Sequence, residues 1–332
     1  MRQRPIRWGV LGTGHMAQVF TEDLLRMPGH HVMAVGSRNS RTAQAFAQRH
    51  NISRAYGSYT DLAADDEIDV IYVATPNNTH YSAGQTCLQG GRAIVMEKPF
   101  TVTAEQAQGL ISLARERRVF AMEAMWMRFN PVIRRLRELV SDGAIGEVTA
   151  LYADFCFAPA YDPNHRVWAP ELAGGALLDL GVYPLSLAWM LLGQPDDIRT
   201  VSSPAATGVD ANTAVLLHYR AGAIALLHCG LLAQSTQTAT VIGTTGRIDV
   251  APPFFRPREL TLHRDGRRSE AFAIELVGHG YTYQAAEVAH CLRSGSTESS
   301  LMPLHETLAI LRILDAVRDG FTNGPHVIAR AL

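Results

Sequence analysis

The chain has few cysteines and no obvious metal-ligand spacing. Its 332 residues include four cysteines, which are far apart and form no Cys-x-x-Cys pair: Cys87, Cys156, Cys229 and Cys291. Its 13 histidines likewise show no paired spacing of the kind that zinc sites use. We therefore expect reduced thiols, a cytoplasmic location and no structural metal.

An excess of charge of one sign is also lacking. The sequence has 30 basic and 31 acidic residues, which gives a formal net charge of −1. Such a balance offers no broad attraction to nucleic-acid phosphates or to anionic lipids. We therefore expect neither nucleic acid nor a membrane as a partner, and any charged ligand has to be bound by local groups.

Long uninterrupted apolar runs are absent as well. Residues 174–193 form the most apolar stretch, but Asp179, Gly181, Pro184 and Ser186 interrupt it. A membrane-spanning helix needs about 20 predominantly apolar residues, so we expect a buried helix here. Residues 1–7 are basic, and the apolar stretch after them is broken by Gly12. This pattern lacks the apolar region and cleavage site of a secretory signal.

Two successive patterns divide the chain, whose length suggests roughly two domains. In residues 1–125 short apolar runs alternate with helical stretches, which is typical of βαβ units in a parallel sheet. From residue 126 onward, strand-like stretches separated by turns predict a largely antiparallel sheet with one face covered by helices. We therefore expect an N-terminal doubly wound Rossmann domain (1–125) and a C-terminal α+β domain (126–332) for substrate binding and oligomerisation.

A Gly-x-Gly-x-x-Ala turn follows the first expected strand and precedes the first expected helix. Gly12 can form the tight turn, Gly14 allows close approach of a pyrophosphate, and Ala17 permits close helix packing. The helix N-terminus adds free amides and a partial positive charge. We expect the cofactor to contact this turn through Gly12, Thr13, Gly14, His15 and Met16.

The end of the second expected strand predicts which dinucleotide binds. An NAD-specific site usually carries an acidic residue here for the ribose 2′-hydroxyl, but residues 32–41 contain no Asp or Glu. Ser37 and Arg38, followed by Arg41, instead suit a 2′-phosphate. We therefore expect NADP(H), with NAD(H) as the alternative.

Two further segments follow strands whose carboxyl ends should face the ligand. After the strand at 70–74 come Thr75, Pro76, Asn77 and His80, which could contact the nicotinamide ribose. After the strand at 93–96 come Glu97 and Lys98. A lysine that ends an apolar strand needs a partner or a function, and beside a substrate hydroxyl it could lower the pKa of a neighbouring acid.

Several motifs together resemble one protein family. They are the glycine turn at 12–17, the Ala-Thr-Pro-Asn-Asn-Thr-His stretch at 74–80, Glu97-Lys98-Pro99, and the segments at 123–129, 143–147 and 174–184. This combination resembles the glucose–fructose oxidoreductase and inositol dehydrogenase family, Gfo/Idh/MocA, over nearly the whole chain. The later segments resemble the branch that contains dimeric dihydrodiol dehydrogenases and xylose dehydrogenases. The inositol dehydrogenase branch has histidine where Tyr183 stands, so that branch fits less well.

The resemblance implies roles for three residues. Tyr183 would be the general acid/base that exchanges a proton with the substrate hydroxyl, and Asp179 would orient Lys98 or a sugar hydroxyl. Their spacing of four places both on one face of an α-helix. A phenol with an ordinary pKa of about 10 needs a nearby cation to act near neutrality, and Lys98 is its expected source. The resemblance also implies a cis Lys98-Pro99 bond.

The substrate is expected to lie beside aromatic and charged side chains. The loop from 155 to 168 contains Phe157 and Arg166, which suit stacking and bidentate hydrogen bonding to a sugar or cyclic diol. Trp126 matches an aromatic residue that the resembled branch places beside the nicotinamide. With Asp179 and Tyr183, these residues form the expected substrate site.

The sequence thus predicts an NADP-dependent oxidoreductase that acts on a secondary alcohol, or the anomeric carbon, of a sugar or cyclic trans-diol. One alternative is a non-catalytic nucleotide sensor of the same fold, although a sensor would need neither Lys98 nor Tyr183. Another is hydrolysis or elimination with a transiently reduced bound cofactor. Apolar residues on both faces of the strand at 223–232 further predict a homodimer, or a dimer of dimers, through the uncovered sheet face.

Overall fold

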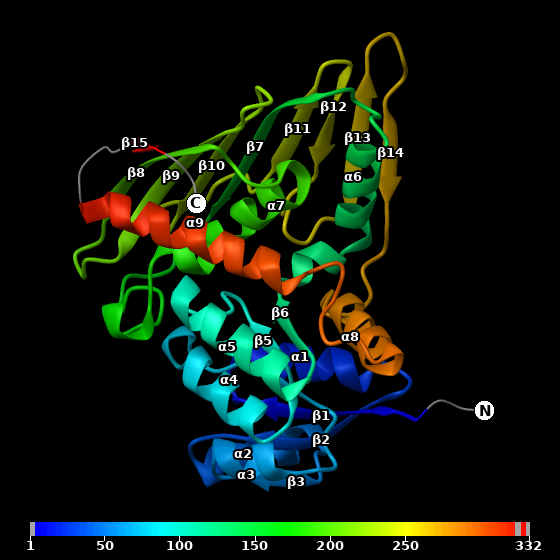
Figure 1. The fold of residues 1–332 in the computed structure, drawn as a ribbon, viewed down its shortest axis with the longest axis vertical. Helices are drawn as coiled ribbons and strands as arrows, with labels where there is room; N and C mark the ends of the chain where they lie inside the picture. The colour runs from blue at the N-terminus through cyan, green and yellow to red at the C-terminus, as the bar shows by residue number, and fades with distance from the viewer. Residues whose placement is uncertain (1–3, 323–326, 330–332) are drawn as a thin grey trace. The chain divides into compact units, whose positions relative to one another are not determined.

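The computed structural model describes residues 4–322 and 327–329 of the chain (Figure 1). By its internal contacts the chain divides into two compact units, of which the first comprises Met1–Trp126 and Leu276–Leu308. The second comprises Met127–Glu275 and Ala309–Leu332. Residues 276–308, which the sequence predicts in the C-terminal domain, thus belong by their contacts to the first unit.

The first unit contains a six-stranded parallel sheet in the order β3-β2-β1-β4-β5-β6. This is the predicted doubly wound arrangement, in which the chain reverses direction between β1 and β4. The strands are β1 (Ile6–Leu11), β2 (His30–Gly36), β3 (Arg54–Tyr56), β4 (Val70–Val73), β5 (Ala93–Glu97) and β6 (Ala121–Ala124). The helices are α1 (His15–Leu25), α2 (Ser40–His50), α3 (Tyr59–Ala64), α4 (His80–Gln89), α5 (Ala104–Arg117) and α8 (Thr282–Ser294).

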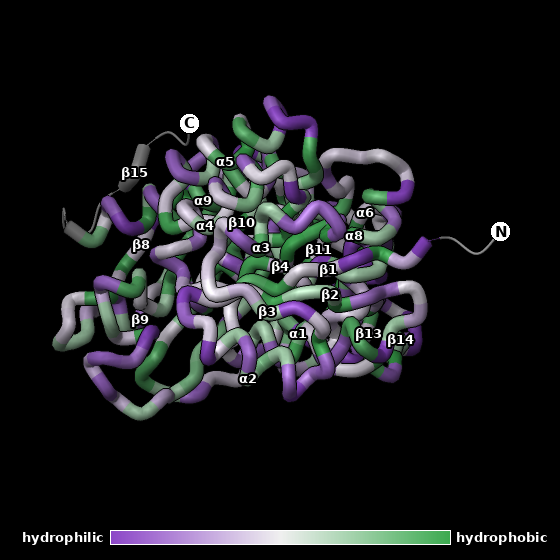
Figure 2. The backbone as a smooth tube through the Cα atoms, turned by 90° about the horizontal axis from the view of Figure 1, so that it is seen from below, coloured by the Kyte–Doolittle hydropathy of each residue, from purple (hydrophilic) through white to green (hydrophobic). Residues whose placement is uncertain are grey.

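Local sequence explains most of these elements. All residues of β4 and β5 are buried, as expected for strands covered on both faces, and Figure 2 colours much of β4 as hydrophobic. Asn39 and Thr103 cap α2 and α5 by accepting hydrogen bonds from backbone N–H groups of the first turn. The strand β3 was not predicted, because three half-buried residues give no apolar run.

The second unit contains a nine-stranded sheet in the order β14-β13-β12-β11-β7-β10-β9-β8-β15. Its pairs are antiparallel except for β7 with β10, which confirms the prediction of a largely antiparallel sheet. The central strands are β7 (Val148–Cys156), β8 (Asp197–Pro204), β9 (Asp210–His218), β10 (Ile224–Gly230) and β11 (Ala239–Gly243). The outer strands are β12 (Gly246–Val250), β13 (Glu259–Arg264), β14 (Glu270–Ala273) and β15 (Val327–Ala329).

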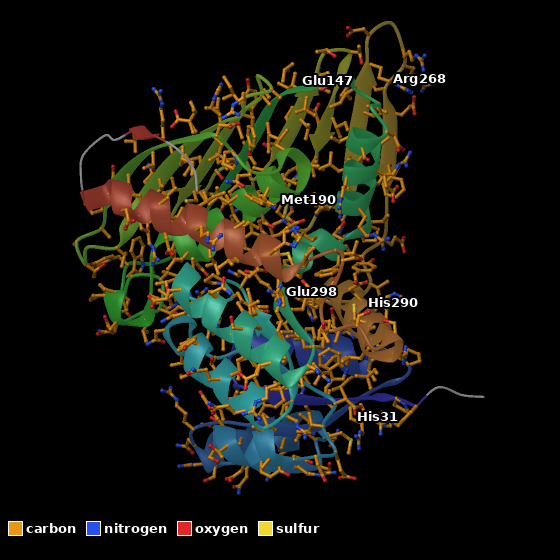
Figure 3. The ribbon with its side chains drawn as sticks, in the orientation of Figure 1. His31, Glu147, Met190, Arg268, His290 and Glu298 are labelled. Carbon is orange, nitrogen blue, oxygen red and sulfur yellow. The ribbon has the colours of Figure 1, made fainter. Side chains whose placement is uncertain are left out.

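The apolar stretch at 174–193 forms the core helix of this unit. It consists of a π-helical turn, Leu177–Gly181, which continues directly into α7 (Val182–Leu192). By length and mean hydropathy, residues Pro170–Leu192 could cross a membrane, but 78% of their most apolar window is buried inside the fold. Met190, labelled in Figure 3, lies in the last turn of α7. The stretch is therefore a core element, as predicted.

Other helices complete the second unit. The helix α6 (Pro131–Ser141) begins at a cap in which the Asn130 side chain accepts from the Val132 amide, and it packs against β13. The long helix α9 (Leu304–Thr322) begins in the first unit and continues into the second. Because α7 packs against β7 and β10, it covers one face of the sheet (Figure 1).

Candidate active site

The glycine turn of the first unit has the geometry that a dinucleotide requires. Gly12 has a φ of +110°, and a Cβ on it would lie 2.4 Å from the carbonyl oxygen of Ala74, so only glycine fits. A Cβ on Gly14 would meet no heavy atom within 4 Å, which leaves open space where a pyrophosphate would approach. Since α1 begins at His15 after a glycine N-cap, its first N–H groups have no side-chain cap. Thr13 and Met16 are half-buried in this turn.

Ser37 and Arg38 lie where the 2′-phosphate of NADP would bind in such a fold. They directly follow β2, and Arg38 is exposed. The hydroxyl of Ser37 lies 2.9 Å from that of Thr42, and Asn39 caps α2 just beyond. The segment therefore presents a hydroxyl, a guanidinium and a helix N-terminus, all of which favour a phosphate.

The segment after β4 has an unsatisfied polar atom that fits a nucleotide. The Thr75 hydroxyl is buried and has no hydrogen-bond partner in the part of the chain that the structure describes. A ribose or nicotinamide group would supply such a partner, since buried polar atoms are normally hydrogen-bonded. Next to Thr75, Pro76 is exposed and Asn77 is half-buried.

His80 joins the segments that follow β4 and β5. Its ring is fully buried, with Nδ1 2.8 Å from the carbonyl oxygen of Pro99 and Nε2 2.9 Å from that of Thr75. Burial lowers the pKa of His80, while the two carbonyl oxygens act in the opposite direction. The contacts of its ring nitrogens therefore hold two loops of the protein in place, whereas the sequence analysis expected His80 to contact the cofactor.

Glu97 is the last residue of β5, and Lys98 directly follows it. The Glu97 carboxylate is buried, accepts a hydrogen bond from the Tyr72 hydroxyl, and accepts another from the Lys98 amide at 3.2 Å. The Lys98-Pro99 bond is cis, which confirms that prediction. The buried carboxylate of Glu97 thus holds the backbone of the next residue, Lys98, in place.

Trp126 is buried against Tyr281, with ring centroids 4.5 Å apart. The Tyr281 amide donates to the Asp23 carboxylate at 2.9 Å, and the His279 amide donates to the same carboxylate. Asp23 and Tyr281 were not identified from the sequence. Asp23 lies on α1 and carries a buried carboxylate, but only the fold reveals that it anchors a loop more than 250 residues away.

In the second unit, Asp179 and Tyr183 are both buried on the central helix, with exposures of 4% and 5%. Asp179 lies in the π-helical turn, and Tyr183 lies in the first turn of α7. The predicted placement of both residues on one helix face requires a regular α-helix, and the wider π turn corrects that prediction. Such turns are rare and are frequent at functional sites.

Two aromatic rings surround Tyr183. The ring centroids of Phe155 and Phe255 lie 5.4 Å and 5.5 Å from that of Tyr183, and the two rings stack on each other at 4.0 Å. Phe255 was missed because it lies in an irregular Pro-Pro-Phe-Phe segment about 70 residues away in sequence. Phe157, which was chosen instead of Phe155, is half-buried just beyond β7.

Arg166 reaches the helix from the preceding loop. Its guanidinium Nη1 lies 2.9 Å from Oδ1 of Asp179. In the same loop the Trp168 indole donates to the Ala160 carbonyl oxygen at 3.1 Å and packs against Tyr161. Side chains of this loop thus contact one another, and Arg166 forms an ion pair that links the loop to Asp179.

The acidic, histidine and cysteine side chains are otherwise dispersed. Among residues 4–322 and 327–329, no group of three or more His, Cys, Asp or Glu side chains could hold a metal ion. The predicted site residues therefore offer hydroxyl, carboxylate, ammonium and guanidinium groups to a ligand.

Comparisons with known proteins match both parts of the chain. A model of the Gfo/Idh/MocA oxidoreductase family, with an NAD-binding Rossmann fold, matches residues 6–125, and the Gfo/Idh/MocA C-terminal domain matches residues 133–249. The trans-1,2-dihydrobenzene-1,2-diol dehydrogenase of Mus musculus is 37% identical over 325 residues, which cover 94% of this chain and 96% of the mouse protein. The D-xylose 1-dehydrogenase (NADP(+)) of Hypocrea jecorina is 33% identical over 367 residues, with 97% and 94% covered.

Solved structures agree. A 3-ketoreductase from Actinomadura kijaniata in complex with NADP and TDP-benzene superposes with a TM-score of 0.84 at 28% identity, covering 96% of this chain and 98% of that one. An aldose-aldose oxidoreductase from Caulobacter crescentus shares the fold, with a TM-score of 0.89 at 20% identity and 98% of this chain and 100% of that one covered. The chain belongs to the Gfo/Idh/MocA family of NAD(P)-binding oxidoreductases.

Proposed function

We propose that this NAD(P)-dependent oxidoreductase transfers hydride between NADP(H) and a CH–OH group of a sugar or a cyclic trans-diol. The observation that carries the proposal is Tyr183, a phenol buried between Phe155 and Phe255 and four residues after the ion-paired Asp179. The names of the relatives, a dihydrodiol dehydrogenase and a D-xylose dehydrogenase, support this substrate class.

The nicotinamide, when bound, supplies or accepts the hydride. Tyr183 accepts the proton of the reacting hydroxyl at its phenolic oxygen during oxidation and returns a proton during reduction. Asp179 and Arg166 form a paired carboxylate and guanidinium that can bind the other hydroxyl groups of a polyol. The aromatic faces of Phe155 and Phe255 exclude water from the phenol and offer an apolar surface to a sugar or diol ring.

NADP is the proposed cofactor rather than NAD. Half-buried Ser37 and exposed Arg38 directly follow β2, and no acidic side chain lies between residues 32 and 41. In this proposal Gly12, Thr13, Gly14, His15 and Met16 bind the pyrophosphate. The nicotinamide side is bound by Thr75, Pro76, Asn77, Glu97, Lys98 and Trp126, with His80 holding their loops.

We also propose that a second copy of this chain covers the free face of the nine-stranded sheet. Apolar side chains on that face are exposed, namely Tyr152, Val201, Ile224 and Leu226, at 44%, 68%, 39% and 46%. Tyr152 and Leu226 are register partners on the parallel pair β7 and β10, so they form one continuous patch. An isologous dimer is the commonest way to bury such a patch.

The four cysteines support the proposed cytoplasmic location. Cys87, Cys156, Cys229 and Cys291 are all buried and unbridged. Burial raises the pKa of the Cys87 and Cys291 thiols to about 12, so both stay protonated and unreactive. Such thiols need no oxidising compartment.

The experiment that tests the function is a screen of NADP reduction across aldoses, inositols and trans-dihydrodiols with the purified chain. Reduction of NADP by an aldose or dihydrodiol, dependent on enzyme concentration, is the expected result. Tight NADP binding without turnover of any compound would favour a nucleotide sensor instead. Product formation without net change of cofactor absorbance would favour hydrolysis or elimination through a transiently reduced cofactor.

A further inference from the structure

The helix that carries Asp179 and Tyr183 starts at a half-buried carboxylate from another element. Asp210 is the first residue of β9, and its Oδ2 accepts a hydrogen bond of 2.7 Å from the Leu177 amide. The same oxygen accepts from the Thr213 hydroxyl at 3.0 Å. Leu177 is the first residue of the π-helical turn, so its N–H has no partner within the helix. Asp210 therefore satisfies the first free amide of the segment that leads to Tyr183.

Two glycines make room for this contact. Gly175 has a φ of +116°, and a Cβ on it would lie 2.2 Å from Oδ1 of Asp210. A Cβ on Gly174 would lie 2.8 Å from the carbonyl oxygens of Arg166 and Val167. The Gly-Gly pair thus lets both the carboxylate and the loop that bears Arg166 pack against the start of the helix.

The choice of a carboxylate here costs stability. Burial raises the pKa of Asp210 to about 6, although hydrogen bonds from Leu177 and Thr213 and the charge of Arg318 act in the opposite direction. Serine or asparagine at the same place would cap the helix without placing a charge in a half-buried position.

The π-helical turn indicates a role for the hydrogen bond between Asp210 and the Leu177 amide. A π turn is rare because the regular α-helix competes with it, and a change of register by one residue would rotate every later side chain by about 100°. Anchoring the Leu177 amide fixes where the wide turn begins. The direction in which Asp179 and Tyr183 point then follows from that starting position.

We propose that Asp210 is a positioning residue, which sets the register of the π-helical turn and thereby the direction of Asp179 and Tyr183. The proposal rests on the proposed function, in which Tyr183 exchanges the proton of the substrate hydroxyl. Asp210 itself touches the helix and not the reacting atoms, so it acts through the segment 177–183.

The test compares Asp210→Ala with Asp210→Asn, which keeps an acceptor oxygen for the Leu177 amide. Thr213→Val removes the other donor to the carboxylate, and Asp196→Ala removes a carboxylate of the same unit that accepts a backbone amide, that of Arg220, at 2.7 Å. For each variant the kcat, the KM for the substrate, the pH profile of kcat, the Kd for NADP and the Tm are measured.

For Asp210→Ala we expect a loss of kcat of about tenfold to a hundredfold, within the range of a misplaced general acid/base. The pH profile of kcat should shift, and the Kd for NADP should stay within about twofold because NADP binds the other unit. Asp210→Asn should restore most of kcat, and the variants Thr213→Val and Asp196→Ala should keep it. A lowered Tm with unchanged kcat and pH profile in Asp210→Ala would show an ordinary helix cap and overturn the proposal.

Failure of the proposed function is recognised separately through Tyr183→Phe. If Tyr183→Phe turns over like the unmutated chain, the role of Tyr183 is wrong whatever Asp210 does. If Tyr183→Phe is inactive while Asp210→Ala keeps both kcat and its pH profile, only the positioning role of Asp210 is wrong. If Asp210→Ala does not fold, the kcat of Asp210→Asn is compared with that of Thr213→Val instead. A kcat of Asp210→Asn as low as that of Tyr183→Phe would also contradict the proposal.

Discussion

The guanidinium of Arg166 lies 2.9 Å from the carboxylate of Asp179 and ties an exposed loop to a buried helix. The side chain of Arg166 is 54% exposed, whereas that of Asp179 is 6% exposed. A buried carboxylate is costly unless it is paired and hydrogen-bonded. Arg166 can therefore pair with Asp179 in the core and still present part of its guanidinium to a ligand.

Replacement of Arg166 by alanine should raise the substrate KM more than it lowers kcat. A charge-assisted hydrogen bond contributes about 1.5–3 kcal/mol, which corresponds to about a tenfold to hundredfold change, and exposure favours the lower end. Steady-state kinetics with the substrate from the NADP screen checks this. Arg268→Ala serves as the control, since Arg268 is exposed in the turn between β13 and β14 (Figure 3). A KM equal to that of the control would remove Arg166 from the substrate site.

Removal of the Tyr183 hydroxyl should abolish most turnover and leave cofactor binding intact. General acid/base catalysis contributes about 10²–10⁴-fold, so Tyr183→Phe should lower kcat by about a hundredfold or more. The ring would keep its packing against Phe155 and Phe255, so the fold should persist. Cofactor titration by fluorescence and stopped-flow kinetics measure both quantities. Normal turnover of this variant would exclude Tyr183 as the acid/base.

Arg38→Ala should weaken NADP binding about tenfold and hardly change NAD binding. The guanidinium is exposed, so its charge-assisted bond to a 2′-phosphate lies at the lower end of the usual range. Calorimetric titration of both cofactors against the unmutated chain and the variant checks this. Arg41→Ala shows whether the neighbouring guanidinium contributes. Equal affinities of the unmutated chain for both cofactors, or equal losses in Arg38→Ala, would refute the assignment.

The sequence predicted the parallel sheet and its glycine turn because both depend on local patterns. Buried strands such as β4 and β5 are apolar throughout, and the positive φ of Gly12 requires the residue that is found there. Asp210, Phe255 and Tyr281 escaped prediction for the opposite reason. Each contacts a partner that is 30 or more residues away in the sequence. A single acidic or aromatic residue at a strand end or in a loop gives no periodic signal.

The π-helical turn was unpredictable for a different reason. Residues 177–181 are apolar apart from Asp179, and they continue smoothly into α7, so their pattern is that of an α-helix. The wider turn is fixed by contacts with Asp210 and by the Gly174-Gly175 pair. Tertiary contacts of this kind override local propensity.

A charge in the exposed sheet face should prevent self-association. Leu226→Glu places a carboxylate beside its register partner Tyr152, where a second copy would have to bury it. Sedimentation velocity at micromolar concentration should give a dimer, or a dimer of dimers, for the unmutated chain and a smaller species for the variant. Glu259→Lys on β13 provides a control at an exposed position of the same sheet. A monomer for the unmutated chain would contradict the proposed assembly.

The raised pKa of Asp210 predicts how stability depends on pH. The pKa of this carboxyl is about 6 in the folded chain against an ordinary value of 3.8, chiefly because burial disfavours its charge. The folded state therefore binds the proton more tightly than the unfolded state, so this group stabilises the fold fully below about pH 4 and loses that effect as the pH rises through 6.

Substitution of Asp210 by asparagine should remove this dependence, because the amide does not titrate and keeps an acceptor for the Leu177 amide. At about 1.4 kcal/mol per pKa unit, the contribution amounts to about 3 kcal/mol between pH 4 and pH 7. Urea unfolding of both chains at several pH values in this range measures it, and the difference between them cancels other titrating groups such as His30, whose pKa burial lowers to about 4. The free energy of unfolding of the unmutated chain should fall relative to that of Asp210→Asn as the pH rises. If the free energies of unfolding of the two chains change in parallel with pH, folding does not raise the pKa of Asp210.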